Sequence, residues 1–240
     1  MLSCGHEEYW SLEMVTNAKT FRNNGGNIAF LTGNTCYRRV SINPDVSITC
    51  YKDLKNNTER WCNDPSPHTN VENRLTGVRF DGTGLFRFQN ELGIGFFVQN
   101  ENDPLYTGQD ITNGVNMGLS AGDIFGAHQS AVGANPPKGG IVGCEADGAK
   151  VNEEGFRTPT GADGTPSNFK VLAYAPIGAG FDTSFGGPAT MGWYQYFTNG
   201  NPAQPKGIVF TGATLDWARV ISQDAIVEQI TKNLLNWLTQ

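Results

Sequence analysis

Two tyrosines and a glutamate each follow a short apolar run that has the length of a β-strand. Tyr9 comes after residues 2–4, Tyr37 after residues 27–32, and Glu145 directly after residues 140–144. If these runs are neighbouring parallel strands, the three side chains project from one edge of a sheet, where open α/β sheets bind ligands. Two phenol oxygens and a carboxylate form a hard, oxygen-rich site. Three such anionic ligands would neutralise Fe(III) and leave coordination positions open, as Lewis-acid catalysis requires.

The same residues also have an ordinary interpretation. A tyrosine near a strand end is more often a half-buried aromatic side chain with a hydrogen-bonded hydroxyl group. His6 and Glu8 fit a solvated turn ahead of a helix, and neither His68 nor His128 stands at a zinc-ligand spacing from His6. Residue types and spacing therefore leave both interpretations open.

The elements that must position these residues begin with a predicted β-α-β unit. Ser11 is a good helix N-cap, and Gly25-Gly26 is a typical helix stop, so a helix joins the apolar runs at 2–4 and 28–31. Such a crossover makes the two strands parallel neighbours. We expect further strands at 170–176, 189–197 and 207–211, and a final helix from an N-cap at Ser222 to about Leu238.

The final helix carries one apolar stripe, which we interpret as core: Ile226, Ile230, Leu234 and Leu238. Residues 100–140 are rich in Gly and Asn, and we expect an active-site cover or an insertion there. The pattern predicts a single α/β domain over residues 1–240, with a mostly parallel sheet and helices on its faces. Because residues 1–4 read as the end of a strand, we expect the chain to be the C-terminal part of a longer protein.

Composition narrows the classes of function. The net charge is −6 and the longest basic run is Arg38-Arg39, which argues against a nucleic-acid partner. No apolar stretch approaches the roughly 18 residues of a membrane span, and no signal peptide is visible. Five cysteines at irregular spacings indicate free thiols in a reducing compartment, which favours the cytoplasm, although a Cys50–Cys62 bridge is compatible with the spacing.

Four blocks of the chain are SCGHEEYWS at 3–11, AFLTGNTCYR at 29–38, VGCEAD at 142–147 and VFTGATLDW at 209–217. These and other blocks between residues 3 and 238 resemble, in the same order, segments of the N,N-dimethylformamidase large (beta) subunit family. The segment SCGHEEYWS at 3–11 is similar to the family's SGHDEYWS, and AFLTGNTCYR at 29–38 is similar to AFLSGNTLYWR. VGCEAD at 142–147 resembles VGYEVD, and VFTGATLDW at 209–217 resembles VFAAGTIQW.

This resemblance implies a fold similar to class I glutamine amidotransferases, a three-layer α/β sandwich, here with a long loop-rich insertion. It implies a mononuclear non-haem Fe(III) held by Tyr9, Tyr37 and Glu145, and hydrolysis of the C–N bond of a small N-substituted amide. It also suggests a small partner subunit and a homo-oligomer. His6 or Glu8, beside the first ligand, could shuttle a proton to the leaving amine.

Two other functions stay open. A non-catalytic binding module that retained the fold is favoured by the long segment at 100–140 and by the absence of the histidine that the family carries just before its glutamate. A glutamine-amidotransferase-like hydrolase would use Cys4 or Cys36 as its nucleophile. Cys4 has His6 only two residues away, and nucleophile and base usually come from different segments, which disfavours this third function.

Overall fold

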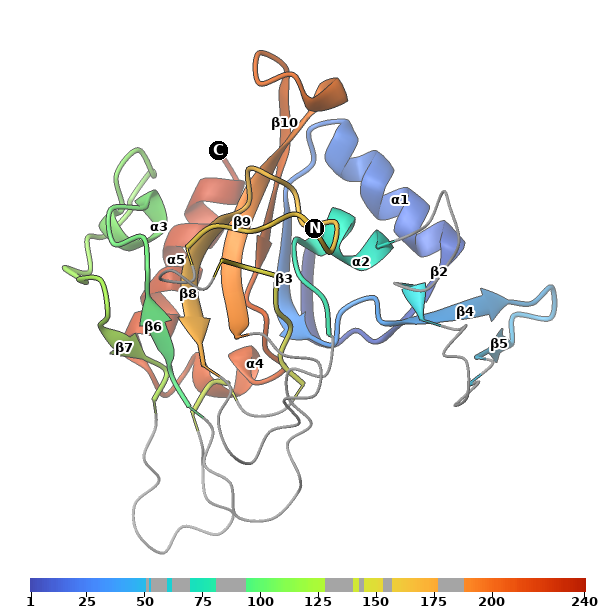
Figure 1. Cartoon of the computed structure of the whole chain (residues 1–240), viewed down its shortest axis with the longest axis horizontal. Coiled ribbons are helices and arrows are strands. Elements are labelled where there is room, and N and C mark those ends of the chain that lie inside the picture. Colours follow the sequence, from blue (N-terminus) through green and yellow to red (C-terminus); the bar gives the residue numbers. More distant parts are fainter. Residues whose placement is uncertain are drawn as a thin grey trace, which may run out of the picture.

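The computed structural model describes residues 1–50, 52, 60–61, 70–80, 94–127, 140–142, 145–152, 157–176 and 188–240. Helices and strands follow one another along the chain as β1 (Leu2–His6), β2 (Tyr9–Ser11), α1 (Leu12–Asn23), β3 (Ile28–Gly33), β4 (Arg38–Ile42), β5 (Ile48–Thr49), α2 (Val71–Thr76), β6 (Phe96–Val98), α3 (Pro104–Thr107), β7 (Ile124–Phe125), β8 (Lys170–Ala175), β9 (Ala189–Phe197), β10 (Pro205–Thr211), α4 (Trp217–Val220) and α5 (Ala225–Leu238). Figure 1 shows this arrangement around one curled central sheet.

The central sheet has seven strands in the order β1-β3-β10-β9-β8-β6-β7. The predicted β-α-β unit is confirmed, because β1 and β3 are parallel and α1 connects them, with Leu2 opposite Ala29. β10 also runs parallel to β3. The remaining pairs, from β10 through β9, β8 and β6 to β7, are all antiparallel.

The prediction of a mostly parallel sheet is therefore wrong. β9 ends at Phe197 and β10 begins at Pro205, so a short turn links them and no crossover helix fits between them. Parallel strands need a crossover of a dozen or more residues, whereas a short turn makes neighbours antiparallel. When helices cover both faces of a sheet, a strand such as β9 is apolar whether its neighbours are parallel or antiparallel to it. The apolar run therefore does not indicate the direction of the strand.

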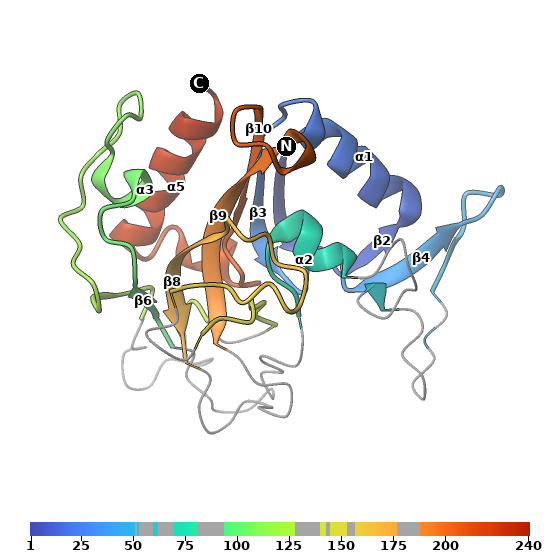
Figure 2. The same ribbon diagram turned by 45° about the horizontal axis from the view of Figure 1, so that its top comes forward.

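Helices cover both faces of the central sheet, which gives the expected layers despite the different strand directions (Figures 1 and 2). β3 shows why, because its side chains alternate between two cores. Ile28 and Phe30 belong to the cluster that includes Val15 of α1. Ala29 and Leu31 belong to the cluster that includes the apolar side chains of α4 and α5. All four β3 residues are at most 4% exposed.

A smaller sheet, in the order β2-β4-β5, extends from the side of the molecule. β2 and β4 are parallel, with Tyr9 opposite Arg38, and β4 and β5 form an antiparallel hairpin. Ser11 ends β2 and caps α1 as predicted, since its hydroxyl accepts a hydrogen bond from the Met14 amide at 3.3 Å. The cap therefore fixes where the small sheet passes into the first helix.

The last helix begins later than predicted. Its N-cap is Asp224, whose carboxylate accepts from the amides of Ile226 and Val227 at 2.9 and 3.0 Å, whereas Ser222 lies in the preceding turn. Both residue types are good N-caps, and the extended backbone at Asp224 decides between them. The predicted stripe does face the core, since Ile230 and Leu234 are fully buried and Ile226 and Leu238 pack partly against the same cluster.

The segment predicted as a cover or insertion is described from residue 100 to 127, and 128–139 lie outside the described residues. Its described part contains α3 and β7 and packs beside α5. Asn233 of α5 donates to the carbonyls of Leu105 and Val115, both at 2.9 Å. Figures 1 and 2 show this part on the side of the molecule away from β2 and β4.

The prediction of a strand at 140–144 is wrong for residues 140–142, the part of this range that the structure describes. Val142 forms only an isolated bridge with Ile94, and residues 143–144 lie outside the described residues. Separately, the described helices include none that is long and apolar enough to cross a lipid bilayer.

Candidate active site

The candidate site lies beyond the carboxyl ends of the three parallel strands. β1 ends at His6 and β3 at Gly33, side by side in the sheet. The chain at 145–147 crosses the neighbouring end of β10, where Ala146 pairs with Thr214 and the Asp147 amide donates to the Ala213 carbonyl at 2.9 Å. Glu145 therefore reaches the predicted sheet edge, but it arrives on an irregular segment and not on a strand.

Gly33 brings the glutamate segment against the end of β3. A Cβ atom at this position would lie 1.8 Å from the Glu145 carbonyl oxygen and 2.7 Å from the Leu215 amide nitrogen. Contacts below 3.0 Å are essentially never seen for real Cβ atoms. A glycine is therefore required here for the close approach of two backbone segments.

The backbone around the site is held in the left-handed region at three non-glycine residues. Asn34 has φ 54°, Cys36 has φ 57° and Glu145 has φ 47°. Asn tolerates this conformation, whereas Cys and Glu adopt it rarely. The turn after β3 is fixed by Asp147, whose carboxylate accepts from the amides of Asn34 and Thr35 at 2.7 and 3.2 Å. Strained backbone that the surroundings hold in place is typical of functional sites.

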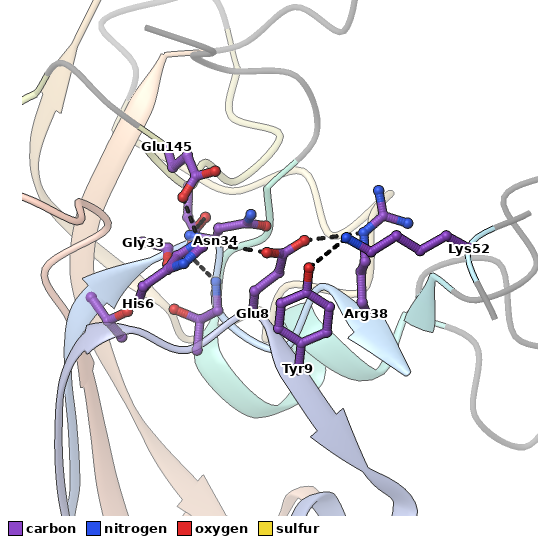
Figure 3. Close-up of polar contacts among 11 residues, drawn as sticks. His6, Glu8, Tyr9, Gly33, Asn34, Arg38, Lys52 and Glu145 are labelled. Atoms are coloured by element: carbon purple, nitrogen blue, oxygen red, sulfur yellow. Dashed lines mark hydrogen bonds and ion pairs between the residues drawn. The ribbon is translucent and has the colours of Figure 1, made fainter. Parts of the chain in front are cut away.

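Four side chains meet at this edge in one polar network (Figure 3). Nε2 of His6 is 2.5 Å from Oε2 of Glu145 and 3.7 Å from Oε2 of Glu8, and Oε1 of Glu8 accepts from Nε of Arg38 at 3.0 Å. Burial raises the pKa of Glu145, while the nearby imidazole of His6 opposes that rise. The His6 side chain thus lies between two carboxylates, within hydrogen-bond distance of Glu145 and within ion-pair distance of Glu8.

Tyr9 stands beside this network on β2. The residue is 39% exposed, and its hydroxyl accepts a hydrogen bond from Nζ of Lys52 at 2.7 Å, as Figure 3 shows. This hydrogen bond raises the pKa of Lys52.

Tyr37 is half-buried just before β4. Its ring packs edge-on against Phe80 at 5.2 Å between centroids. The guanidinium carbons of Arg60 and Arg38 lie 4.6 and 5.1 Å from the centre of the ring. Arg38 links this tyrosine to the network, since the same guanidinium holds Glu8.

The donor atoms at this edge suit a hard cation more than a soft one. Within the ranges that the structure describes, no group of three His, Cys, Asp or Glu side chains could hold a metal ion. Phenols stand outside that criterion. Tyr9 on β2, Tyr37 just before β4 and Glu145 beside the end of β10 each carry oxygen atoms of the kind that hard cations prefer. Asn34 is 3% exposed, and in the described structure its Oδ1 has no hydrogen-bond partner. A buried oxygen without a partner is costly, so a cation or water at this edge would relieve it.

Sequence reasoning missed Asp147 as a member of the site. The residue is fully buried, and burial raises its pKa from 3.8 to about 7, although the hydrogen bonds from the Thr35 and Asn34 amides act in the opposite direction. Its only signal in the sequence is its place two residues after Glu145 in a recognisable block. Lys52 was also missed, because nothing in the sequence indicates that the β4–β5 hairpin brings it to Tyr9.

The two thiols proposed as nucleophiles are poorly suited to that role. Cys36 is fully buried, and burial raises its pKa well above the ordinary value. Burial and, to a smaller extent, Glu7 also raise the pKa of Cys4, which is exposed on β1. Reactive cysteines have a lowered pKa, because the thiolate is the nucleophile. Cys62, the candidate partner of Cys50, lies outside the described residues.

The comparisons with known proteins agree with the blocks identified in the sequence. A search among curated proteins finds no match. The family model described as "N,N-dimethylformamidase beta subunit-like, C-terminal" matches residues 1–230, and this range includes every residue of the network in Figure 3. With nearly its whole length matched, the chain belongs to the N,N-dimethylformamidase beta subunit-like C-terminal domain family.

Proposed function

We propose that this domain hydrolyses the C–N bond of a small N-substituted amide to a carboxylic acid and an amine, with one non-haem Fe(III) ion held by Tyr9, Tyr37 and Glu145. The observation that supports this most is the contact of His6 with Glu145, at 2.5 Å, beyond the carboxyl ends of the parallel strands. It brings a proton-carrying imidazole to a carboxylate in the region where α/β sheets bind their ligands.

The residues fit the ion by the chemistry of their donors. Two phenol oxygens and one carboxylate are hard ligands, and Oδ1 of Asn34 is a buried oxygen without a partner in the described structure. Lys52 at Tyr9 and the guanidinium groups around Tyr37 place positive charge beside both phenol side chains. When bound, the ion would supply Lewis acidity, which polarises an amide carbonyl and acidifies water.

The chain's own residues would manage the protons of the reaction. Hydrolysis adds a water oxygen to the carbonyl carbon, breaks the C–N bond, and needs one proton taken from water and one given to the amine nitrogen. His6 can do both through Nε2, since its side chain is 41% exposed and open to a substrate. Glu8 lies 3.7 Å from Nε2 of His6 and is itself held by Arg38.

Metal analysis with a visible spectrum of the purified protein tests the proposal. Fe(III)-phenolate absorbs visible light, so the wild type should contain iron and be coloured. Tyr37→Phe and Tyr9→Phe should each lose iron and amide hydrolysis. His6→Gln should keep the iron and the colour but hydrolyse poorly. The matched control is Tyr174→Phe, which should change neither, because the Tyr174 ring stacks on Phe97 of β6, and β10, β9 and β8 separate β6 from β3 in the sheet. Retention of iron and colour in Tyr37→Phe would refute the assignment.

The second candidate is a non-catalytic binding module. It is favoured by the pairing of Tyr9 with Lys52 and of Glu145 with His6, in which side chains of the protein already contact two of the three proposed ligand groups. The same preparation separates the two functions, because a colourless protein that binds no added iron and has no hydrolase activity supports the module.

A further inference from the structure

A second concave site lies at the opposite end of the parallel strands. It has a volume of about 560 Å³ and is formed by the last turns of α1, by α2, and by β9 with the turn into β10. Figures 1 and 2 show that turn beside the C-terminal end of α1, at the edge away from the ends of β1 and β3. We call this site the α1–β9 groove. Its volume falls within the range of small-molecule pockets.

The floor of the groove holds a buried charge with neutral partners. Arg22 of α1 is 5% exposed. Its guanidinium donates to the Arg74 carbonyl at 2.8 Å, to the Tyr194 hydroxyl at 2.7 Å and to the Asn23 side-chain oxygen at 2.9 and 3.0 Å. It also lies 4.2 Å from the centre of the Tyr196 ring. Buried charges are normally paired with an opposite charge, and here the hydrogen-bonding groups are all uncharged.

Two further cations stand on the rim. Lys19 of α1 and Arg74 of α2 line the groove with Arg22, and the lining residues that the structure describes include no Asp or Glu. Among the described residues, neither Lys19 nor Arg74 forms an ion pair. Burial, followed by repulsion from Arg22, lowers the pKa of Lys19, which a bound anion would reverse. Three uncompensated cations in one groove are unusual in a chain of net charge −6.

We propose that the α1–β9 groove binds a small organic dianion, a phosphate ester or a dicarboxylate, whose flat part rests on the aromatic wall. Lys19 and Arg74 contact the anionic group of the ligand, and the positive charge of the buried Arg22 attracts that group from below. Arg22 is fixed by α2 and β9, so the charge is positioned before the ligand arrives. Tyr196 and Phe197 line the wall beside these cations.

Isothermal titration calorimetry tests this with two flat probes, phenyl phosphate and phthalate, and with inorganic phosphate. We expect at least one flat probe to bind, and phenyl phosphate to bind more tightly than inorganic phosphate because its ring adds contact with the wall. Lys19→Met and Arg74→Gln should each weaken binding roughly tenfold or more, as loss of a charge-assisted hydrogen bond does. Lys19→Arg should restore it. Lys150→Met, an exposed lysine outside the groove, removes the same charge and is the matched control.

Each outcome decides the proposal. Binding of phenyl phosphate alone identifies a phosphate site, and binding of phthalate identifies a carboxylate site. If neither flat probe binds at concentrations up to ~10 mM, the proposal is overturned. This result also covers the case in which an acidic polypeptide, and not a small dianion, occupies the groove. Equal affinity in Lys19→Met and Lys150→Met would also overturn it. Circular dichroism checks that each variant is folded. We expect Arg74→Gln to fold, because Arg22 bonds to the backbone carbonyl of Arg74 and not to the Arg74 side chain.

Discussion

Replacing Gly33 by alanine should damage the stability and the candidate site together. The added Cβ would lie 1.8 Å from the Glu145 carbonyl oxygen, and real Cβ atoms essentially never come within 3.0 Å of such an atom. The glutamate segment must therefore retreat by about 1.2 Å, and it is anchored on its other side by the pairing of Ala146 with Thr214. Overpacking of this kind costs about 1–3 kcal/mol of unfolding free energy.

The same displacement would break the contact between His6 and Glu145. At 2.5 Å, these atoms lie within hydrogen-bond distance, and a retreat of about 1 Å takes them beyond it. Urea denaturation measures the loss of stability. The imidazole resonances report the site, because the chain has only three histidines and the signal of His6 can be assigned by substitution.

Gly118→Ala is the matched control. Gly118 has φ +63°, and a Cβ built there has nothing within 4 Å, so the substitution adds backbone strain without crowding. It should cost about 1 kcal/mol and leave the His6 resonance unchanged. If Gly33→Ala is as stable as the wild type and its His6 resonance does not move, the close approach of Glu145 to β3 is wrong.

Three more variants test other parts of the structure. Asp147→Asn should flatten the pH dependence of stability. In the folded wild type the pKa of this acid is raised from 3.8 to about 7, so the free energy of unfolding falls by up to about 4 kcal/mol as pH rises from about 4 through 7. Urea midpoints at both ends of that range measure the slope. Leu234→Ala should cost about 2–5 kcal/mol in thermal unfolding, whereas Leu235→Ala, 40% exposed, should cost little. Asp224→Ala should cost about 1 kcal/mol and Ser222→Ala almost nothing, and the reverse order in urea would contradict the observed cap.

The first half of the fold was predictable because its signals are local. Ser11 caps α1 through a hydrogen bond to its own first turn, and the apolar runs on either side are too short for anything but strands. The direction of the later strands has no local signal. The residues of β9 would be equally apolar in a parallel or an antiparallel sheet, and only the length of the link to β10 distinguishes the two.

Half of the site follows from the same logic. His6 and the turn after β3 lie side by side because β1 and β3 are parallel, as expected. Asp147 and Lys52 were not predictable, because each acts on a residue far away in the sequence through a contact that only the folded chain creates. The cytoplasmic location, the small partner subunit and the homo-oligomer stay predictions.

The site is also where local preference and global fold disagree. Glu145 and Cys36 adopt a left-handed backbone that both residue types avoid, and Gly33 is the last residue of a buried strand, where glycine adds no side-chain packing. Natural sequences keep such conflicts where surrounding contacts hold the strained conformation and function requires it. Here the carboxylate of Asp147 supplies that hold, since it bonds the two amides of the turn that carries Asn34. The strain is therefore concentrated on the segments that bring Glu145 to His6, at the edge to which we assign the chemistry.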